Sequence, residues 1–569
     1  MPPLGLFRNA PALRSPIGFG ASDFIELALL LAVVFGFVLS NRIEPRVRRF
    51  AARPGWSMAL LAVATVALRL ALLPHLPVPV PAIYDEFSHL LVGDTLRHFR
   101  LANPAHPLPQ FFETFFVLQE PSYSSIYPIG QGLALAFGRL VFGHPWAGVV
   151  LSMAGFVSLC YWMLRGWVSP AWALVGGVLA LFEFGPLSPW MNTYWGGGVS
   201  AIAGCLVFGA LPRFRRDGRL RDAAVLGAGM GLQLLARPYE SVLLLISVLA
   251  FLAPVLWRRK ELLPIVVATA LPAVGLTLLQ NKQATGSWTT LPAVLSRYQY
   301  GVPTTFAFQP VPVPHWALTA QQEMSYRSQL SYHDTPVSYP RRFWYRLRYY
   351  EFFFTPALYL AAAAFLLRLR KPRFTWVALT IVLFALGSNL YPFFFPHYVA
   401  ALTCLFVLVV VVGLQVWPRR VARLILILAG AHFLFWYGRQ LMAGEPPMRP
   451  RTVVEQKLSG GKQLVFVRYS PRHIFQDEWV YNDADIDRAR IVWARDLGSA
   501  ENEKLRQYYP DRAAWLLEPD DAPPKLVPYV PEPGPQPVPE PPKPAVTETK
   551  PPAKTSKPVL KFEEVPEAK

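Results

Sequence analysis

The sequence predicts an all-α polytopic membrane protein with a small extracytoplasmic α/β domain and a disordered Pro-rich tail. Of its 569 residues, 53% are hydrophobic and only 16% are charged, whereas soluble domains carry about 25% charged residues. The mean hydropathy is positive, +0.29. The apolar residues are gathered into runs that approach the roughly 20 residues needed to span a bilayer. With 3 Cys, all inside apolar runs, the composition also excludes a disulfide-stapled chain.

About twelve runs have this length and almost no interior charge. The first lacks a short basic leader and a small-residue cleavage site, so we expect a retained anchor rather than a signal peptide. The predicted spans are approximately 23–40, 57–74, 146–164, 170–185, 196–211, 222–236, 240–257, 262–280, 352–368, 374–391, 396–417 and 421–438.

Lys and Arg gather in the short connections between these runs, as is typical of cytoplasmic loops. With the basic clusters inside, both termini and the polar loops at about 75–145 and 281–351 are extracytoplasmic. Much of the net charge of +19 is then a topology signal, and nucleic acid is not an expected partner. A bacterial cytoplasmic (inner) membrane is the expected location. The clusters are Arg42 to Arg53, Arg213 to Arg221, Arg258 to Lys260, Arg368 to Arg373 and Arg419 to Arg423.

The apolar segment Gly130 to Phe142 is too short to span alone, so we expect it to lie along the membrane surface. Beyond Tyr437 the composition changes. QLVFVRY, ARIVWARD and RAAWLLEPD read as strands, and SAENEKLRQYY reads as a helix capped at Ser499. The predicted organisation is an N-terminal segment (1–22), a membrane domain (23–440), an α/β domain (441–520) and a Pro-rich tail (521–569) that cannot bury a core.

Two adjacent carboxylates, Asp85 and Glu86, lie at the water end of the span 57–74. On a helix, Asp85 and His89 share a face because residues four apart are neighbours. Such a patch suits a general base, or a divalent cation such as Mg or Mn held by carboxylate oxygens. The alternative is a pair of solvated charges at the start of a helix.

These residues precede the stretch YP-x-GQG-L-x-LA-x-G-x-x-x-FG, which begins at Tyr127 and includes Gln131. Together they resemble the GT-C superfamily of integral-membrane glycosyltransferases, which includes protein O-mannosyltransferases, the lipid A aminoarabinose transferase and RgtA/B/C/D-like transferases. The resemblance covers about residues 57–440 and is most specific from Tyr84 to Pro145. It implies transfer of a sugar from a polyprenyl-phosphate carrier to a protein, lipid or glycan acceptor at the extracytoplasmic face. It also implies that Asp85, with Glu86 beside it, acts as the base or positions the acceptor, and that a divalent cation takes part in some members.

Cationic groups that suit a lipid phosphate occur at other outer positions. Arg237 can meet a phosphate through charge-assisted hydrogen bonds, or can pair with Glu240 in the same short loop. His397 can bind a phosphate or donate a proton, with Tyr398 beside it, or can be a satisfied interfacial histidine. In the loop 281–351, which has no evident secondary structure, we expect a basic surface for an anionic ligand or for lipid headgroups. Its candidate phosphate ligands are Arg341 and Arg342.

The resulting hypothesis is a membrane glycosyltransferase in which Asp85 accepts the proton of an acceptor hydroxyl and the anomeric configuration inverts. A transporter or flippase of lipid-linked sugars is an alternative, although ion-coupled transport places ionisable residues near the bilayer centre. A non-catalytic envelope scaffold is another. The remaining residues of the predicted substrate pocket are His89, Tyr127, Gln131, Asn192, Tyr194, Glu240 and Tyr398.

Overall fold

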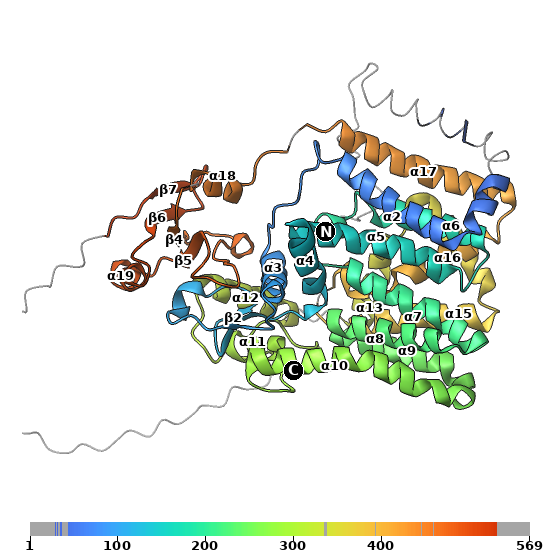
Figure 1. Cartoon of the computed structure of the whole chain (residues 1–569), viewed down its shortest axis with the longest axis horizontal. Helices are drawn as coiled ribbons and strands as arrows, with labels where there is room; N and C mark the ends of the chain where they lie inside the picture. The colour runs from blue at the N-terminus through green and yellow to red at the C-terminus, as the bar shows by residue number, and fades with distance from the viewer. Residues whose placement is uncertain are drawn as a thin grey trace, which may run out of the picture.

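The computed structural model describes residues 44–531 apart from 335–337, 393, 445 and 459, and also residues 29, 31, 33, 35 and 36 (Figure 1). The predicted N-terminal segment and most of the first span lie outside the described residues, as does the tail from residue 532.

A bundle of helices forms the larger part of the molecule (Figure 1), and every predicted span from 57–74 to 421–438 contains helix. Many of these helices begin with Pro, whose fixed φ suits the first helical turn. Within the described residues, six helices are long and apolar enough to cross a membrane, which indicates an integral membrane protein. The bundle helices are α2 (Pro54–Ala71), α5 (Pro145–Leu164), α6 (Pro170–Phe184), α7 (Gly198–Asp217), α8 (Leu220–Ala236), α9 (Pro238–Leu256), α10 (Leu263–Thr285), α14 (Tyr359–Phe365), α15 (Pro372–Ser388), α16 (Thr403–Leu414) and α17 (Arg419–Leu441).

The centre of the bundle is α16, whose twelve residues are all buried. An α-helix that is apolar on every side has to be enclosed by other elements, and α16 packs against α6, α7 and α14. A short 3-10 segment, Pro396–Leu402, leads into α16 and brings His397 and Tyr398 to its N-terminal end.

The two long polar loops that are predicted to be extracytoplasmic, 75–145 and 281–351, are called the first and second outer loops below. The first outer loop folds into two helices and a small sheet. Helix α3 (Tyr84–Arg97) is followed by the antiparallel strands β1 (Asn103–Pro104), β2 (Val117–Leu118) and β3 (Ser122–Ser125), and then by α4 (Ile129–Phe142). Helices α3 and α4 approach closely because both have glycine at the crossing. A Cβ on Gly93 would lie 2.7 Å from the Leu135 Cβ, and a Cβ on Gly132 would lie 2.2 Å from a methyl of Val92.

Helix α4 coincides with the segment predicted to lie along the membrane surface. Leu133, Phe137, Leu140 and Val141 are exposed, whereas Leu135 and Ala136 are buried. An exposed apolar face is the pattern expected of a helix that rests in the bilayer interface.

The second outer loop is more regular than the sequence indicated. It contains α11 (Pro292–Tyr300), α12 (Ala320–Asp334) and α13 (Tyr339–Tyr349), so the expectation of a connection without regular secondary structure is wrong. The sequence of α13 is rich in Arg and aromatic residues, which are common at a membrane interface. Because they interrupt the apolar pattern, the helical periodicity of this segment is hard to recognise in the sequence.

A small mixed sheet follows the bundle, with strand order β5-β4-β6-β7. Strand β4 (Gln463–Val467) pairs in parallel with β5 (Ile491–Arg495) and with β6 (Ala513–Glu518), and α19 (Ser499–Tyr508) connects the latter two. We call α18 (Pro450–Lys457) and this sheet, residues 450–528, the C-terminal unit. The three predicted strands and the helix are confirmed, although Gly498 rather than Ser499 occupies the N-cap of α19.

The start of the predicted disordered tail needs a correction. Strand β7 (Lys525–Pro528) pairs antiparallel with β6, with Glu518 opposite Lys525. Pro dominates the local sequence here, yet Pro528 ends the strand at the sheet edge, where a missing N–H is tolerated.

Candidate functional site

Asp85 lies in the first turn of α3, at one end of the helical bundle. The hydroxyl of Tyr127, which directly precedes α4, donates a hydrogen bond to Asp85 Oδ1. Burial, and to a lesser degree the neighbouring Glu86, raise the pKa of Asp85 to about 6, while Tyr127 and the charge of Arg237 act in the opposite direction. At neutral pH, Asp85 is therefore a carboxylate whose basicity is well above that of an ordinary aspartate.

Glu86 points in a different direction and is buried. Its Oε2 accepts hydrogen bonds from the backbone N–H groups of Ala82 (2.8 Å) and Ile83 (3.4 Å), and its Oε1 accepts from Tyr194 N (3.1 Å). Burial raises the pKa of Glu86, and these backbone donors oppose the rise. The carboxylate thus fixes the start of α3 to the loop between α6 and α7.

His89 lies one turn after Asp85 and stacks on the Tyr127 ring, with centroids 4.1 Å apart. Burial and the charge of Arg237 lower the pKa of His89 to about 3, so the imidazole is neutral at pH 7. Its Nδ1 is buried and has no hydrogen-bond partner within the described residues.

Arg237 occupies the junction between α8 and α9, where it is the last cap of one helix and the first of the next. Its guanidinium lies 4.7 Å from the centroid of the Tyr398 ring and 3.7 Å from Glu240 Oε1. The side chain of Arg237 is 23% exposed. The positive charge of Arg237 opposes the rise in the pKa of Asp85 and contributes to the lowered pKa of His89. Arg237 therefore belongs to one electrostatic cluster with these two residues.

His397 and Tyr398 complete this cluster from the N-terminal end of α16. The His397 ring lies 5.6 Å from Trp195 and 4.9 Å from Tyr398. Asp85, His89, Tyr127, Arg237, Glu240, His397 and Tyr398 therefore gather from four separate parts of the chain, and we call this group the Asp85 cluster.

Three other predicted pocket residues support the walls of the site. Gln131 Nε2 donates to the Tyr194 carbonyl (3.2 Å), and the Tyr194 hydroxyl donates to Pro79 O (2.7 Å). The Asn192 amide donates to Pro186 O and Ser188 O, while its Oδ1 accepts from Arg69 Nε (2.8 Å). Their polar groups are thus largely engaged with the protein itself.

Arg69 is a residue that the sequence interpretation missed. It is fully buried near the end of α2, where it also donates to Leu76 O (2.9 Å) and Pro77 O (3.1 Å). The signal was a single Arg inside an otherwise apolar run, and an ionisable residue in such a position marks a special role. Here it ties the chain after α2 to the loop that holds Tyr194.

Arg341 and Arg342 belong to α13. Arg341 is exposed, and its Nε donates to the Tyr345 hydroxyl on the same helix (3.3 Å). The Arg342 guanidinium lies 6.0 Å from the Tyr339 ring. In the described part of the chain, neither guanidinium contacts a residue of the Asp85 cluster. A third arginine of this helix, Arg346, is buried and donates to Tyr391 O (2.8 Å).

The residues at the start of α3 do not fit a cation held by the Asp85–Glu86 pair. Magnesium and manganese need carboxylate oxygens with lone pairs directed at the ion, whereas both Glu86 oxygens face backbone donors. Within the described residues, no three His, Cys, Asp or Glu side chains are grouped as metal ligands. Arg237 supplies positive charge to the Asp85 cluster instead.

No protein-family model and no curated protein sequence matches this chain. The solved structures that are similar to it include the following three. The oligosaccharyltransferase of Archaeoglobus fulgidus in complex with Zn and sulfate has a TM-score of 0.47 and 12% identity, over 81% of this chain and 67% of that chain. ArnT from Cupriavidus metallidurans bound to undecaprenyl phosphate has a TM-score of 0.47 and 12% identity, over 82% and 93%.

The third is AglB from Archaeoglobus fulgidus in complex with an inhibitory peptide and a dolichol-phosphate. It has a TM-score of 0.41 and 11% identity, over 81% of this chain and 69% of that chain.

Proposed function

We propose that this chain is a GT-C-type glycosyltransferase that moves a sugar from a polyprenyl-phosphate donor to an acceptor hydroxyl on the extracytoplasmic face of the membrane. The observation that carries the proposal is the pairing of a basic carboxylate with a cation at one end of the bundle. Asp85 has a pKa of about 6, and Arg237 is the cation of the same cluster. A base for the acceptor and a positive charge for the departing phosphate are what this reaction needs.

In the proposed reaction, the acceptor oxygen attacks the anomeric carbon and its proton passes to Asp85. The bond between the anomeric carbon and the phosphate oxygen breaks, and the electron pair leaves with the lipid phosphate. A single displacement of this kind inverts the anomeric configuration. A positioned base contributes about 10²–10⁴-fold to the rate.

Arg237 is proposed to neutralise the departing phosphate through charge-assisted hydrogen bonds. Glu240 restrains the guanidinium, and the Tyr398 ring supports it from one side. The unpaired Nδ1 of neutral His89 and the His397 imidazole are proposed to bind the donor by hydrogen bonds. Glu86, Gln131, Asn192 and Tyr194 are proposed to hold the wall of the pocket. Arg341 and Arg342 are proposed to attract the anionic carrier from the membrane surface.

The test is transfer from synthetic polyprenyl-phosphate sugars, incubated in lipid nanodiscs with a panel of protein, lipid and glycan acceptors. We expect one donor and acceptor pair to give product with the parent protein and no product with Asp85→Asn. Glu120→Gln is the matched control, because Glu120 is an exposed carboxylate of the same outer loop. Product formation that is equal in the parent and in Asp85→Asn would contradict the assignment of the base.

A further inference from the structure

The two faces of helix α3 pack against different parts of the protein. Asp85 and His89 face the Asp85 cluster, whereas Tyr84, Phe87 and Asp94 face the C-terminal unit. Residues 84, 87, 91 and 94 recur at helical spacing and lie along one stripe. Leu91 of this stripe belongs to the same apolar core as Leu464 and Phe466 of β4. The helix that presents Asp85 is therefore packed from behind by a separate part of the chain.

An aromatic ring stack connects α3 to the C-terminal unit. Phe87 and Tyr481 lie 4.6 Å apart with an interplanar angle of 6°. The Arg451 guanidinium lies 4.8 Å from the Phe87 ring and 4.6 Å from the Trp493 ring. Phe87 is only two residues after Asp85, so a change at this contact acts directly on the turn that carries the carboxylate.

Two further contacts hold α3 at its ends. Tyr84 stacks on Phe475 at 6.3 Å, and Ala484 N donates a hydrogen bond to Asp94 Oδ2 (2.9 Å). Contacts at the first, second and third turns restrain both the translation of α3 and its rotation about its own axis.

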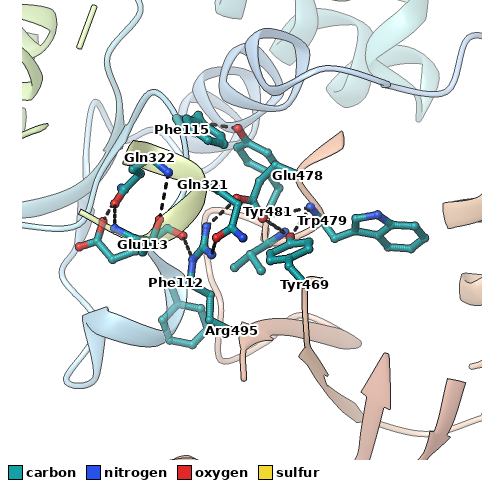
Figure 2. A network of polar contacts seen from close by, with 12 residues as sticks. Phe112, Glu113, Phe115, Gln321, Gln322, Tyr469, Glu478, Trp479, Tyr481 and Arg495 are labelled. Carbon is teal, nitrogen blue, oxygen red and sulfur yellow. Dashed lines mark hydrogen bonds and ion pairs between the residues drawn. The ribbon is translucent and has the colours of Figure 1, made fainter. Parts of the chain in front are cut away.

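The C-terminal unit is itself fixed to the outer loops by a buried polar network (Figure 2). Arg495 Nη2 binds Glu478 Oε2 (2.6 Å), and both side chains are buried. The same guanidinium donates to Glu113 O (2.5 Å) in the first outer loop and to Gln321 Oε1 (2.7 Å) in the second. The Tyr481 hydroxyl donates to Phe115 O (3.1 Å).

A buried ion pair of this kind is costly to break, because removal of one partner leaves the other charge without compensation. The network therefore connects both outer loops to the C-terminal unit. Tyr481 belongs to this network and also stacks on Phe87 of α3.

We propose that the C-terminal unit is a working part of the catalytic apparatus, in which Tyr481 and Arg451 are positioning residues that set the orientation of α3 and hence the place of Asp85. This inference rests on the proposed function. A misplacement of about 1 Å at a reacting group can reduce the rate by about 10²-fold. Loss of the ring stack is thus expected to reduce turnover while donor binding at Arg237 persists.

The test uses full-length Tyr481→Ala and Arg451→Gln in nanodiscs. We expect kcat to fall about 10- to 100-fold, with the donor KM and donor affinity within about two-fold of the parent. Hydrogen exchange at the amides of α3 should accelerate. Tyr481→Phe, which keeps the ring stack and loses the bond to Phe115 O, should retain most of the rate. Tyr508→Ala is the control, because Tyr508 contacts His106 of the first outer loop rather than α3.

Unchanged kcat together with unchanged α3 exchange in folded Tyr481→Ala or Arg451→Gln would overturn the inference. If Tyr481→Ala does not fold, Arg451→Gln decides, because it leaves the Phe87 and Tyr481 rings in place and removes the guanidinium beside Phe87 and Trp493, together with its bonds to Glu455, Trp479 O and Tyr481 O. A parent protein without transfer activity would reject the proposed function instead, and the exchange measurement would still decide whether the C-terminal unit orients α3.

Discussion

Tyr127 donates a hydrogen bond to Asp85 across 42 residues of sequence and thereby joins the two helices of the first outer loop at the candidate base. The bond favours the ionised carboxylate, whereas burial disfavours it. Their balance leaves Asp85 with a pKa of about 6, close to the pH at which a general base is both deprotonated and strong. The phenol of Tyr127 is itself buried, which raises its pKa well above 10, so it acts as a donor throughout the physiological range.

The pH dependence of transfer follows from this balance. Asp85 must be deprotonated to accept a proton, so the rate is expected to fall about tenfold per pH unit below about pH 6. Tyr127→Phe removes a group that lowers the pKa of Asp85, so the acidic limb of the profile should move to higher pH. The measurement is kcat between pH 4.5 and 8.5 under donor saturation. If the acidic limb lies at the same pH in both proteins, the titration of a group other than Asp85 sets the pH dependence of the rate.

Replacement of Asp85 by Asn should abolish turnover without unfolding the protein. The amide keeps the shape of the side chain and can still accept the Tyr127 hydrogen bond, but it has no useful basicity. We expect a rate loss of at least about 10²-fold and nearly unchanged donor affinity, measured by single-turnover transfer and by equilibrium binding. Activity within a few-fold of the parent would remove Asp85 as the base.

Glu86 is expected to respond differently from its neighbour. Glu86→Gln presents an amide NH₂ group to backbone N–H donors that now face a carboxylate oxygen. Hydrogen bonds to charged groups contribute about 1.5–3 kcal/mol each, so the variant should show a lower melting temperature as well as lower turnover. Thermal unfolding in nanodiscs measures the first effect. A full loss of turnover at an unchanged melting temperature would indicate direct participation in chemistry.

The apolar periodicity of the sequence was sufficient to predict the helical bundle, because membrane-length runs and basic connections are local patterns. Polar residues near the ends of the predicted helices, together with the family resemblance, indicated Asp85, Tyr127, Arg237 and Tyr398 as separate candidates. Their convergence depends on contacts between segments far apart in the chain, which no local pattern encodes. The direction of the Glu86 carboxylate was equally inaccessible, since its partner Tyr194 lies 108 residues away.

The errors have a common physical origin. Helix α13 and strand β7 were missed because Arg, aromatic and Pro residues masked their periodicity, and tertiary pairing stabilised both elements. Ser388 O and Tyr391 O bind Arg346 of α13, and β6 provides the partner of β7. Arg69 was missed because one charge in an apolar run does not alter the prediction of a span.

Removal of divalent cations provides a further test. Both Glu86 oxygens accept backbone hydrogen bonds and Arg237 supplies the positive charge, so transfer should stay within about two-fold of its initial rate after chelation. The measurement is the initial rate with and without chelator, followed by addition of Mg or Mn. Complete loss with chelator and recovery with Mn would assign Asp85 as a metal ligand and reject the base.

Donor binding should depend on Arg237 and be separable from chemistry. A charge-assisted contact with a buried phosphate contributes about 1.5–3 kcal/mol, so Arg237→Ala should weaken donor affinity about 10- to 150-fold. Arg237→Lys should rescue only in part, because an ammonium lacks the planar fork of donors. The paired Arg341→Ala and Arg342→Ala variant should weaken binding less, since in the described part of the chain neither guanidinium contacts a residue of the Asp85 cluster.

The measurement is equilibrium binding of a non-hydrolysable polyprenyl-phosphate sugar analogue to purified variants in nanodiscs. Arg327→Ala is the matched control, because Arg327 is an exposed arginine of the second outer loop that pairs with Glu323. Donor affinity that is unchanged in Arg237→Ala but reduced in the α13 variant would move the phosphate site from the α8–α9 junction to α13. The departing phosphate would then need a different cation, since the Arg237 guanidinium of the Asp85 cluster would be engaged with Glu240 and Tyr398.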